Sequence, residues 1–259
     1  ACCYHGLRMV CVVDIKTSSQ NIQILRAYGA EIDCVTEPDP ATGELLPARL
    51  NRVQEWLARV KNSFWPNQYG NPRNFGAHYR TTMHEVATAL EGEVDFVLCA
   101  SSTCGTVRGC GEYVRDHGLR TRVVAVDAVG SLIFSDRQGK RLLPGMGAGV
   151  RPPLCDMRFI DEVDHVADAE CVAGCRRLIR REGIFAGASS GGLVAAVGHL
   201  RDRIPAGAHC VIILPDRGER YLDTVYSDEW VQEHFGELDE LPDLWPRRES
   251  LDSCVTAMS

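Results

Sequence analysis

A run of small and hydroxylated residues follows an apolar segment near the middle of the chain. Residues 94–100 are apolar almost throughout and too short for a buried helix, so they predict a buried strand. The residues that come next are Ser101, Ser102, Thr103, Cys104, Gly105 and Thr106, and helical spacing begins at Thr106. The first N–H groups of a helix have no partner inside it, and the helix dipole adds partial positive charge there. This loop therefore predicts a phosphate site, with an ordinary capped helix start as the alternative.

The elements around this loop form a repeated α/β pattern. Residues 122–127 predict a second strand, which completes a strand, loop, helix, strand unit with parallel strands and a right-handed crossover. Ser189 lies at another junction from a short strand to a helix, and Pro215 follows the last predicted strand, 209–214. Loops that follow parallel strands gather at one edge of a sheet, so we expect these loops to line one crevice. The phosphate would bind at residues 103–106, and a hydroxyl such as that of Ser189 would meet a neutral ring atom.

Glycine recurs at every second position from Gly145 to Gly149. This spacing disfavours a helix, and it lacks the preceding strand and following helix of the dinucleotide-binding fingerprint. No Gly-x-Gly-x-x-Gly loop follows a predicted strand, which argues against a nicotinamide-dependent oxidoreductase. The segment predicts a backbone-lined loop that faces a ligand, with a plain flexible turn as the alternative.

Composition narrows the class of protein. With 45% hydrophobic residues, 24% charged residues and a formal charge of −7, the chain is typical of soluble globular proteins and is not a general nucleic-acid binder. No apolar run approaches the ~20 residues of a membrane span, and no signal segment opens the chain. The 12 cysteines include no Cys-x-x-Cys pair and the eight histidines show no ligand spacing. We therefore expect a cytoplasmic protein with reduced thiols and no metal site.

The chain is expected to form two α/β lobes of unequal size. Residues 1–65 predict part of a smaller lobe, 66–235 a larger lobe that contains the expected phosphate site, and 236–259 an acidic tail. Residues 64–80 are rich in Asn, Gly, Pro and aromatics without periodicity, which is typical of a linker or of a site wall. Residues 1–6 have the pattern of a helix end, so we expect further residues before Ala1.

Six motifs, in chain order, resemble the landmarks of the cysteine synthase and cystathionine β-synthase family. They are residues 67–69, 78–82, 103–106, 145–149, 187–191 and 214–221. The resemblance implies an α/β protein of the pyridoxal-phosphate-dependent fold type II, with two three-layer α/β lobes and mostly parallel sheets. It also implies pyridoxal 5'-phosphate as the cofactor, small amino acids as substrates and a homodimer.

The resemblance assigns roles to particular residues. It implies that residues 102–106 hold the cofactor phosphate, that Ser189 faces the pyridine nitrogen and that Gln68 helps to receive the substrate carboxylate. Gly145 is expected to line the cofactor with its backbone. Arg49, on a helix that the family pattern places near the substrate mouth, is expected to bind the phosphorylated substrate with Tyr69 as its companion.

Within this family, residues 127–134 and 141–145 look most like the branch that serves siderophore biosynthesis. Members of that branch join O-phosphoserine to glutamate on the way to 2,3-diaminopropionate. The phosphate loop departs from the usual Gly-Thr-Gly-Gly-Thr because Ser102 and Cys104 replace two glycines. Side chains there would reshape the acceptor pocket and disfavour a reaction with sulfide. The alternatives are a cysteine synthase that uses O-acetylserine and sulfide, and a non-catalytic member of the family.

The chain has three lysines, Lys16, Lys61 and Lys140. None matches the lysine that forms the Schiff base in this family, and that lysine is expected upstream of Ala1. We therefore expect no catalytic lysine in this chain, and a large loss of rate for the chain alone.

Overall fold

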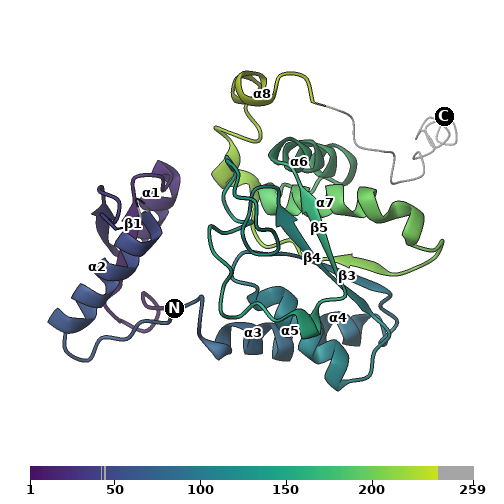
Figure 1. The fold of residues 1–259 in the computed structure, drawn as a ribbon, viewed down its shortest axis with the longest axis horizontal. Coiled ribbons are helices and arrows are strands. Elements are labelled where there is room, and N and C mark those ends of the chain that lie inside the picture. The colour runs from purple at the N-terminus through teal and green to yellow at the C-terminus, as the bar shows by residue number, and fades with distance from the viewer. Residues whose placement is uncertain (42, 44, 239–259) are drawn as a thin grey trace, which may run out of the picture. The chain divides into compact units, whose positions relative to one another are not determined.

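The computed structural model describes residues 1–41, 43 and 45–238, and the chain divides into two compact units, residues 1–67 and 68–259. Figure 1 shows the order of the elements along the chain. Most of the tail expected at 236–259 lies outside the described residues. The lobe boundaries expected at residues 65 and 235 stay predictions.

A four-stranded parallel sheet forms the centre of the second unit. Its strands lie in the order β5 (Glu162–Val166), β4 (Arg122–Ala128), β3 (Phe96–Ala100) and β6 (Cys210–Ile212). Val97 aligns with Val123 on one side and with Val211 on the other. Alternate residues of β3 enter different cores: Phe96 and Leu98 join one apolar cluster, while Val97 and Cys99 join the other. The sheet is therefore buried on both faces, as the continuous apolar run predicts.

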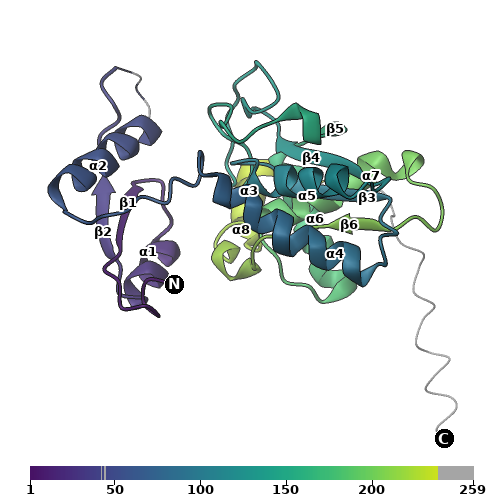
Figure 2. The ribbon, with the colours of Figure 1, turned by 90° about the horizontal axis from the view of Figure 1, so that it is seen from below.

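Helices cover both faces of this sheet, which gives three layers (Figures 1 and 2). One face carries α3 (Pro72–His78), the π-helical turn η1 (Tyr79–Met83), α4 (His84–Ala89) and α5 (Gly105–Asp116). The other face carries α6 (Asp168–Glu182) and α7 (Ala188–Leu200). The remaining elements are η2 (Met157–Phe159), η3 (Arg201–Arg203), η4 (Gly218–Tyr221) and α8 (Asp228–Phe235). The mixed α/β architecture with parallel sheets confirms the predicted fold class.

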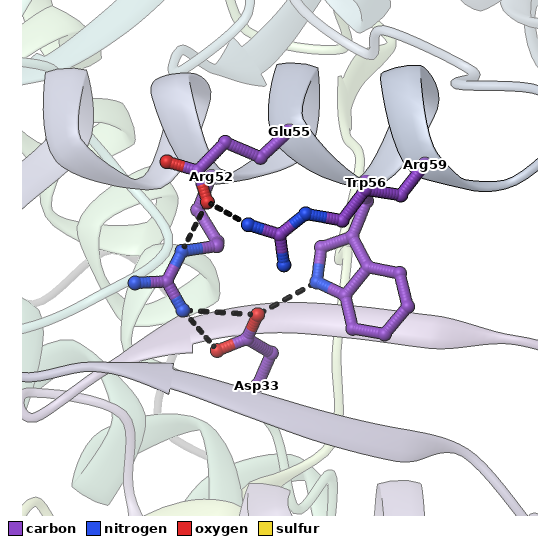
Figure 3. Close-up of polar contacts among 5 residues, drawn as sticks. All are labelled: Asp33, Arg52, Glu55, Trp56 and Arg59. Carbon is purple, nitrogen blue, oxygen red and sulfur yellow. Dashed lines mark hydrogen bonds and ion pairs between the residues drawn. The ribbon is translucent and has the colours of Figure 1, made fainter.

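The first unit has a two-stranded parallel sheet and two helices. Its elements are β1 (Val10–Asp14), α1 (Ser19–Ala27), β2 (Glu31–Val35) and α2 (Leu45–Arg59). Asp33 on β2 joins the sheet to α2, as Figure 3 shows. Its carboxylate accepts hydrogen bonds from Arg52 Nη1 at 2.9 Å and from the Trp56 indole at 2.6 Å.

The structure differs from the expected elements in three places. Residues 72–78 form helix α3, where the sequence predicted no regular structure; Asn71 caps it and Pro72 opens it, a start signal that the weak apolar pattern obscured. The half-exposed edge strand β5 was not predicted. Residues 1–6 form hydrogen-bonded turns that end at Gly6, with φ +64°, and not a helix.

Candidate functional site

The loop after β3 leaves backbone donors without partners. Cys104 takes the left-handed conformation, with φ +63° and ψ 9°, and so turns the chain into α5. The N–H groups of Thr103, Cys104 and Thr106 have no hydrogen-bond acceptor within the described part of the chain. Unpaired N–H groups at a helix start are the donors that a phosphate accepts from.

Asn74 on α3 fixes the conformation of this loop. Its Nδ2 donates to the carbonyl oxygen of Gln68 at 2.7 Å and to Thr103 Oγ1 at 3.2 Å. A Cβ added to Gly105 would lie 2.1 Å from Asn74 Oδ1, so only glycine fits there without displacing Asn74. The sequence analysis did not identify Asn74. Its place two residues into a helix opened by Asn71-Pro72 was the available signal.

His78 lies on the other side of the loop. Its Nε2 is 3.2 Å from Thr106 Oγ1, and its Nδ1 is 3.0 Å from Thr82 Oγ1. Burial lowers the pKa of His78, which favours the neutral ring. A neutral imidazole donates from one nitrogen and accepts at the other, so it can orient both hydroxyls.

A second candidate site region lies in the same unit. It is formed by Ser189, Gly145 and Tyr221. Gly145 has φ +98°, and a Cβ added to it would lie 3.7 Å from Ser189 Oγ and 3.6 Å from the Tyr221 hydroxyl. Ser189 is 2% exposed, and its hydroxyl has no hydrogen-bond partner among the residues that the structure describes. The Tyr221 hydroxyl donates to Asp216 Oδ2 at 2.8 Å.

The loop 145–149 connects the region around residues 101–106 with the region around Ser189. The Gly147 N–H donates to the carbonyl oxygen of Ser101, directly before the phosphate loop, at 2.7 Å. Two residues earlier, Gly145 lies against Ser189. The structure therefore brings residues 101–106, Gly145 and Ser189 to one region of the second unit, with Gln68 tied to it through its backbone.

Arg49 lies on α2 in the first unit and forms an ion pair with Asp14. Its Nε is 3.1 Å from Asp14 Oδ2, and the Asp14 carboxylate is nearly buried. Gln68 has an exposed side chain, and the neighbouring Tyr69 is half-buried. Lys16, Lys61 and Lys140 are all exposed.

Two cysteines interact beside the phosphate loop. Cys104 is buried and packs in the same cluster as the half-buried Cys155. The Cys104 thiol, and then Arg151, lower the pKa of Cys155 to about 7 against an opposing effect of burial. The same interaction, together with burial, raises the pKa of Cys104. Within residues 1–41, 43 and 45–238, no group of three His, Cys, Asp or Glu side chains could hold a metal ion. In the same residues no helix is long and apolar enough to cross a membrane.

These features fit a phosphorylated aromatic ring. Unpaired N–H groups and two hydroxyls stand at one end, and an unpartnered buried hydroxyl stands at the other. The glycine backbone between them leaves space that a Cβ would fill. The three-layer fold and this arrangement agree with the expected class, a pyridoxal-phosphate-dependent enzyme of fold type II.

Comparison with known proteins identifies the family. Residues 1–216 match the sequence family described as "Pyridoxal-phosphate dependent enzyme", and the chain belongs to this family. A curated relative, the N-(2-amino-2-carboxyethyl)-L-glutamate synthase of Ralstonia nicotianae, is 48% identical over 230 residues, which cover 89% of this chain and 68% of the relative.

Solved structures of related enzymes share the fold. The O-acetylserine-dependent cystathionine β-synthase of Helicobacter pylori superposes with a TM-score of 0.79 at 27% identity, over 87% of this chain and 72% of that one. The O-acetylserine sulfhydrylase isoform 3 of Entamoeba histolytica gives 0.76 at 31% identity, over 87% and 67%. The predicted family, its type of β-replacement enzyme and its cofactor, pyridoxal 5'-phosphate, are thereby confirmed.

Proposed function

We propose that the protein catalyses a β-replacement that joins O-phospho-L-serine to L-glutamate, giving N-(2-amino-2-carboxyethyl)-L-glutamate for siderophore biosynthesis. The observation that carries the proposal is the 48% identity, over 230 residues, to a relative named for this reaction. The replacement of two family glycines by Ser102 and Cys104 also supports it, because side chains in the loop disfavour an open sulfide pocket.

Each residue of the candidate site has a proposed task. Pyridoxal phosphate supplies an electron sink for the negative charge that forms on the substrate when its α-proton leaves. The free N–H groups and hydroxyls of residues 102–106 bind the cofactor phosphate. Ser189 holds the ring-nitrogen end, while Gly145 lets its backbone lie close to the ring. Gln68, with Tyr69, binds the substrate carboxylate, and Arg49 binds the substrate phosphate.

Product analysis tests the proposed reaction. Because none of the three lysines of this chain matches the Schiff-base lysine, the assay uses the natural protein at full length. It is incubated with pyridoxal phosphate and each of four pairs, O-phosphoserine or O-acetylserine with glutamate or sulfide, and products are identified by mass spectrometry. We expect N-(2-amino-2-carboxyethyl)-L-glutamate from O-phosphoserine and glutamate, with inorganic phosphate released in equal amount. Cysteine from O-acetylserine and sulfide as the main product would instead support the cysteine synthase alternative. No product from any pair would support a non-catalytic member.

We also propose that the protein is a cytoplasmic homodimer, as the resemblance to the family implies. Light scattering coupled to size-exclusion chromatography measures the mass directly. A mass near twice the 28.6 kDa of the chain is expected, and a monomer mass would contradict it.

A further inference from the structure

A buried carboxyl group near Ser189 has no task in the proposed reaction. Asp216 follows the last strand and accepts the Tyr221 hydroxyl at Oδ2, 2.8 Å away. Its other oxygen, Oδ1, is buried without a hydrogen-bond partner among the described residues. A Cβ added to Gly187 would lie 2.0 Å from this Oδ1, so the carboxyl lies directly against the Gly187 backbone. A buried polar atom left unpaired is destabilising, so its retention calls for an explanation.

The segment around Asp216 braces the start of the helix that carries Ser189. The Gly187 N–H donates to the Asp216 carbonyl oxygen at 3.0 Å, and the Gly218 N–H donates to that of Phe185 at 3.1 Å. Ser189 lies two residues beyond Gly187. The positions of Asp216 and Tyr221 are therefore coupled to that of Ser189 through backbone hydrogen bonds.

The hydrogen bond to Asp216 also determines whether the Tyr221 hydroxyl can act as a donor or as an acceptor toward other groups. Its single proton is directed at the carboxylate, which leaves the oxygen as an acceptor on its remaining side. That oxygen lies 3.6 Å from the Cβ position of Gly145, and Ser189 Oγ lies 3.7 Å from the same position. The two oxygens thus both lie within van der Waals reach of the position that a Cβ of Gly145 would take.

We propose that the Tyr221 oxygen, held by Asp216, accepts a hydrogen bond from a protonated ring nitrogen, which makes Tyr221 a second positioning residue for that end of the cofactor, beside Ser189. This inference rests on the proposed placement of the ring nitrogen at Ser189. Burial raises the pKa of Asp216, partly opposed by the hydrogen bond from Tyr221, and burial also raises the pKa of Tyr221. Both groups are thus kept as a hydrogen-bonded pair, and not as two separate charges.

Binding of two cofactor analogues tests this inference without any reaction. The probes are 4-deoxypyridoxine 5'-phosphate, which lacks the aldehyde and needs no lysine, and its 1-deaza analogue, in which CH replaces the ring nitrogen. Their affinities are measured by fluorescence titration for the unchanged protein, Tyr221→Phe, Asp216→Ala and Asp216→Asn. Tyr79→Phe is the matched control, because the Tyr79 hydroxyl donates to Asp116 Oδ2 at 3.1 Å far along the sequence from Ser189.

The expected result is a loss that depends on the ring nitrogen. Tyr221→Phe and Asp216→Ala lower the affinity for the nitrogen-containing probe about two- to tenfold and change that for the deaza probe much less. Asp216→Asn retains most of the affinity, because its amide oxygen still accepts from Tyr221. Tyr79→Phe changes neither affinity.

Three results would overturn the inference. They are an equal loss for both probes, which marks a purely structural brace, no loss in Tyr221→Phe, and no binding of either probe by the unchanged protein. Failure of the proposed reaction is a separate outcome, because it appears in the product assay and leaves analogue binding intact.

Discussion

Cys104 has an unfavourable backbone conformation but a favourably buried side chain. Its φ of +63° lies in the left-handed region that favours glycine, and a residue with a Cβ is destabilised there by roughly 1 kcal/mol. The side chain is nevertheless buried against the core that contains Cys155. Packing of the side chain therefore stabilises a backbone conformation that a residue with a Cβ disfavours. The sequence shows this position only as a departure from the usual glycine.

The first prediction concerns the neighbouring thiol. Because the pKa of Cys155 is lowered to about 7, its thiolate fraction rises around neutral pH, whereas burial raises the pKa of Cys210 to about 11. We expect iodoacetamide to label Cys155 with a pH midpoint near the lower value and Cys210 only in strong alkali. Peptide mass spectrometry after timed labelling measures both. Cys104→Gly should shift the Cys155 midpoint upward, and an unchanged midpoint would contradict the proposed cause.

The second prediction concerns the glycine next to it. In Gly105→Ala the new Cβ would lie 2.1 Å from Asn74 Oδ1, so Asn74 must move and lose its bonds to Gln68 and Thr103. We expect affinity for 4-deoxypyridoxine 5'-phosphate to fall at least tenfold, which corresponds to ~1.4 kcal/mol. Gly76→Ala, on the same helix as Asn74, is the control because its Cβ would meet only the flexible end of Arg80. Equal affinity in both variants would contradict the role of Asn74.

At the scale of elements, the Asp33 contacts attach α2 to β2 (Figure 3). The carboxylate is mostly buried and accepts from both Arg52 and Trp56. Asp33→Ala should lower the free energy of unfolding by about 1–3 kcal/mol, because two donors lose their acceptor. Urea unfolding followed by tryptophan fluorescence measures this.

The matched control for this element is Glu55→Gln. Glu55 pairs with Arg52 and Arg59 on the exposed face of the same helix. Such pairs contribute at most about 0.5 kcal/mol, so the variant should be close to neutral. A loss as large as that of Asp33→Ala would show that α2 depends on its surface charges instead.

His199 connects three elements of the second unit. On α7, its Nδ1 is 2.8 Å from Asp164 of β5 and its Nε2 is 2.8 Å from Glu170 of α6. Burial lowers its pKa, but the hydrogen bonds to Glu170 and Asp164 outweigh this and leave the pKa raised above 6.5. The imidazolium form thus stabilises the fold below the unfolded pKa, and this contribution is lost as pH rises through the folded pKa.

The prediction is a stability difference that depends on pH. His199→Gln should lower the urea midpoint clearly at about pH 5.5 and less at about pH 9, because the contribution of the imidazolium is lost as pH rises through the folded pKa. Parallel unfolding curves at the two pH values measure it. A difference of the same size at both would show that the contacts of His199 do not depend on its charge.

At the scale of the whole molecule, the resemblance to the family assigns substrate-binding roles to Arg49 and to Gln68. Arg49 belongs to the first unit, and residues 68 and 102–106 to the second. If Arg49 binds the substrate phosphate, Arg49→Ala should raise the apparent KM for O-phosphoserine about tenfold or more and affect the KM for glutamate little. Arg52→Ala, one helical turn away and bound to Asp33, is the control for damage to α2. Equal changes in both variants would remove Arg49 from the substrate site.

The sequence predicted the central fold because its signals were local. The strand before the phosphate loop and the helix ending near residue 117 follow from apolar periodicity and a glycine stop, and six ordered motifs identified the family. Asn74 and Asp216 were missed because their contacts with Thr103 and Gly187 join segments distant in sequence. The periodic pattern of apolar residues along the sequence does not reveal contacts of this kind.

The close approach of Gly187 to Asp216 means that the residue at one position limits which substitutions are possible at the other, 29 residues away. Since a methyl group at 187 would overlap the carboxyl oxygen of Asp216, related chains should not carry alanine at 187 unless 216 has become smaller. A side chain at 187 therefore requires a prior change at 216, and also movement of Tyr221, whose Cε2 would lie 2.7 Å from the same Cβ. Such changes would also loosen the contact that holds the start of α7, and with it Ser189, against the segment at Asp216.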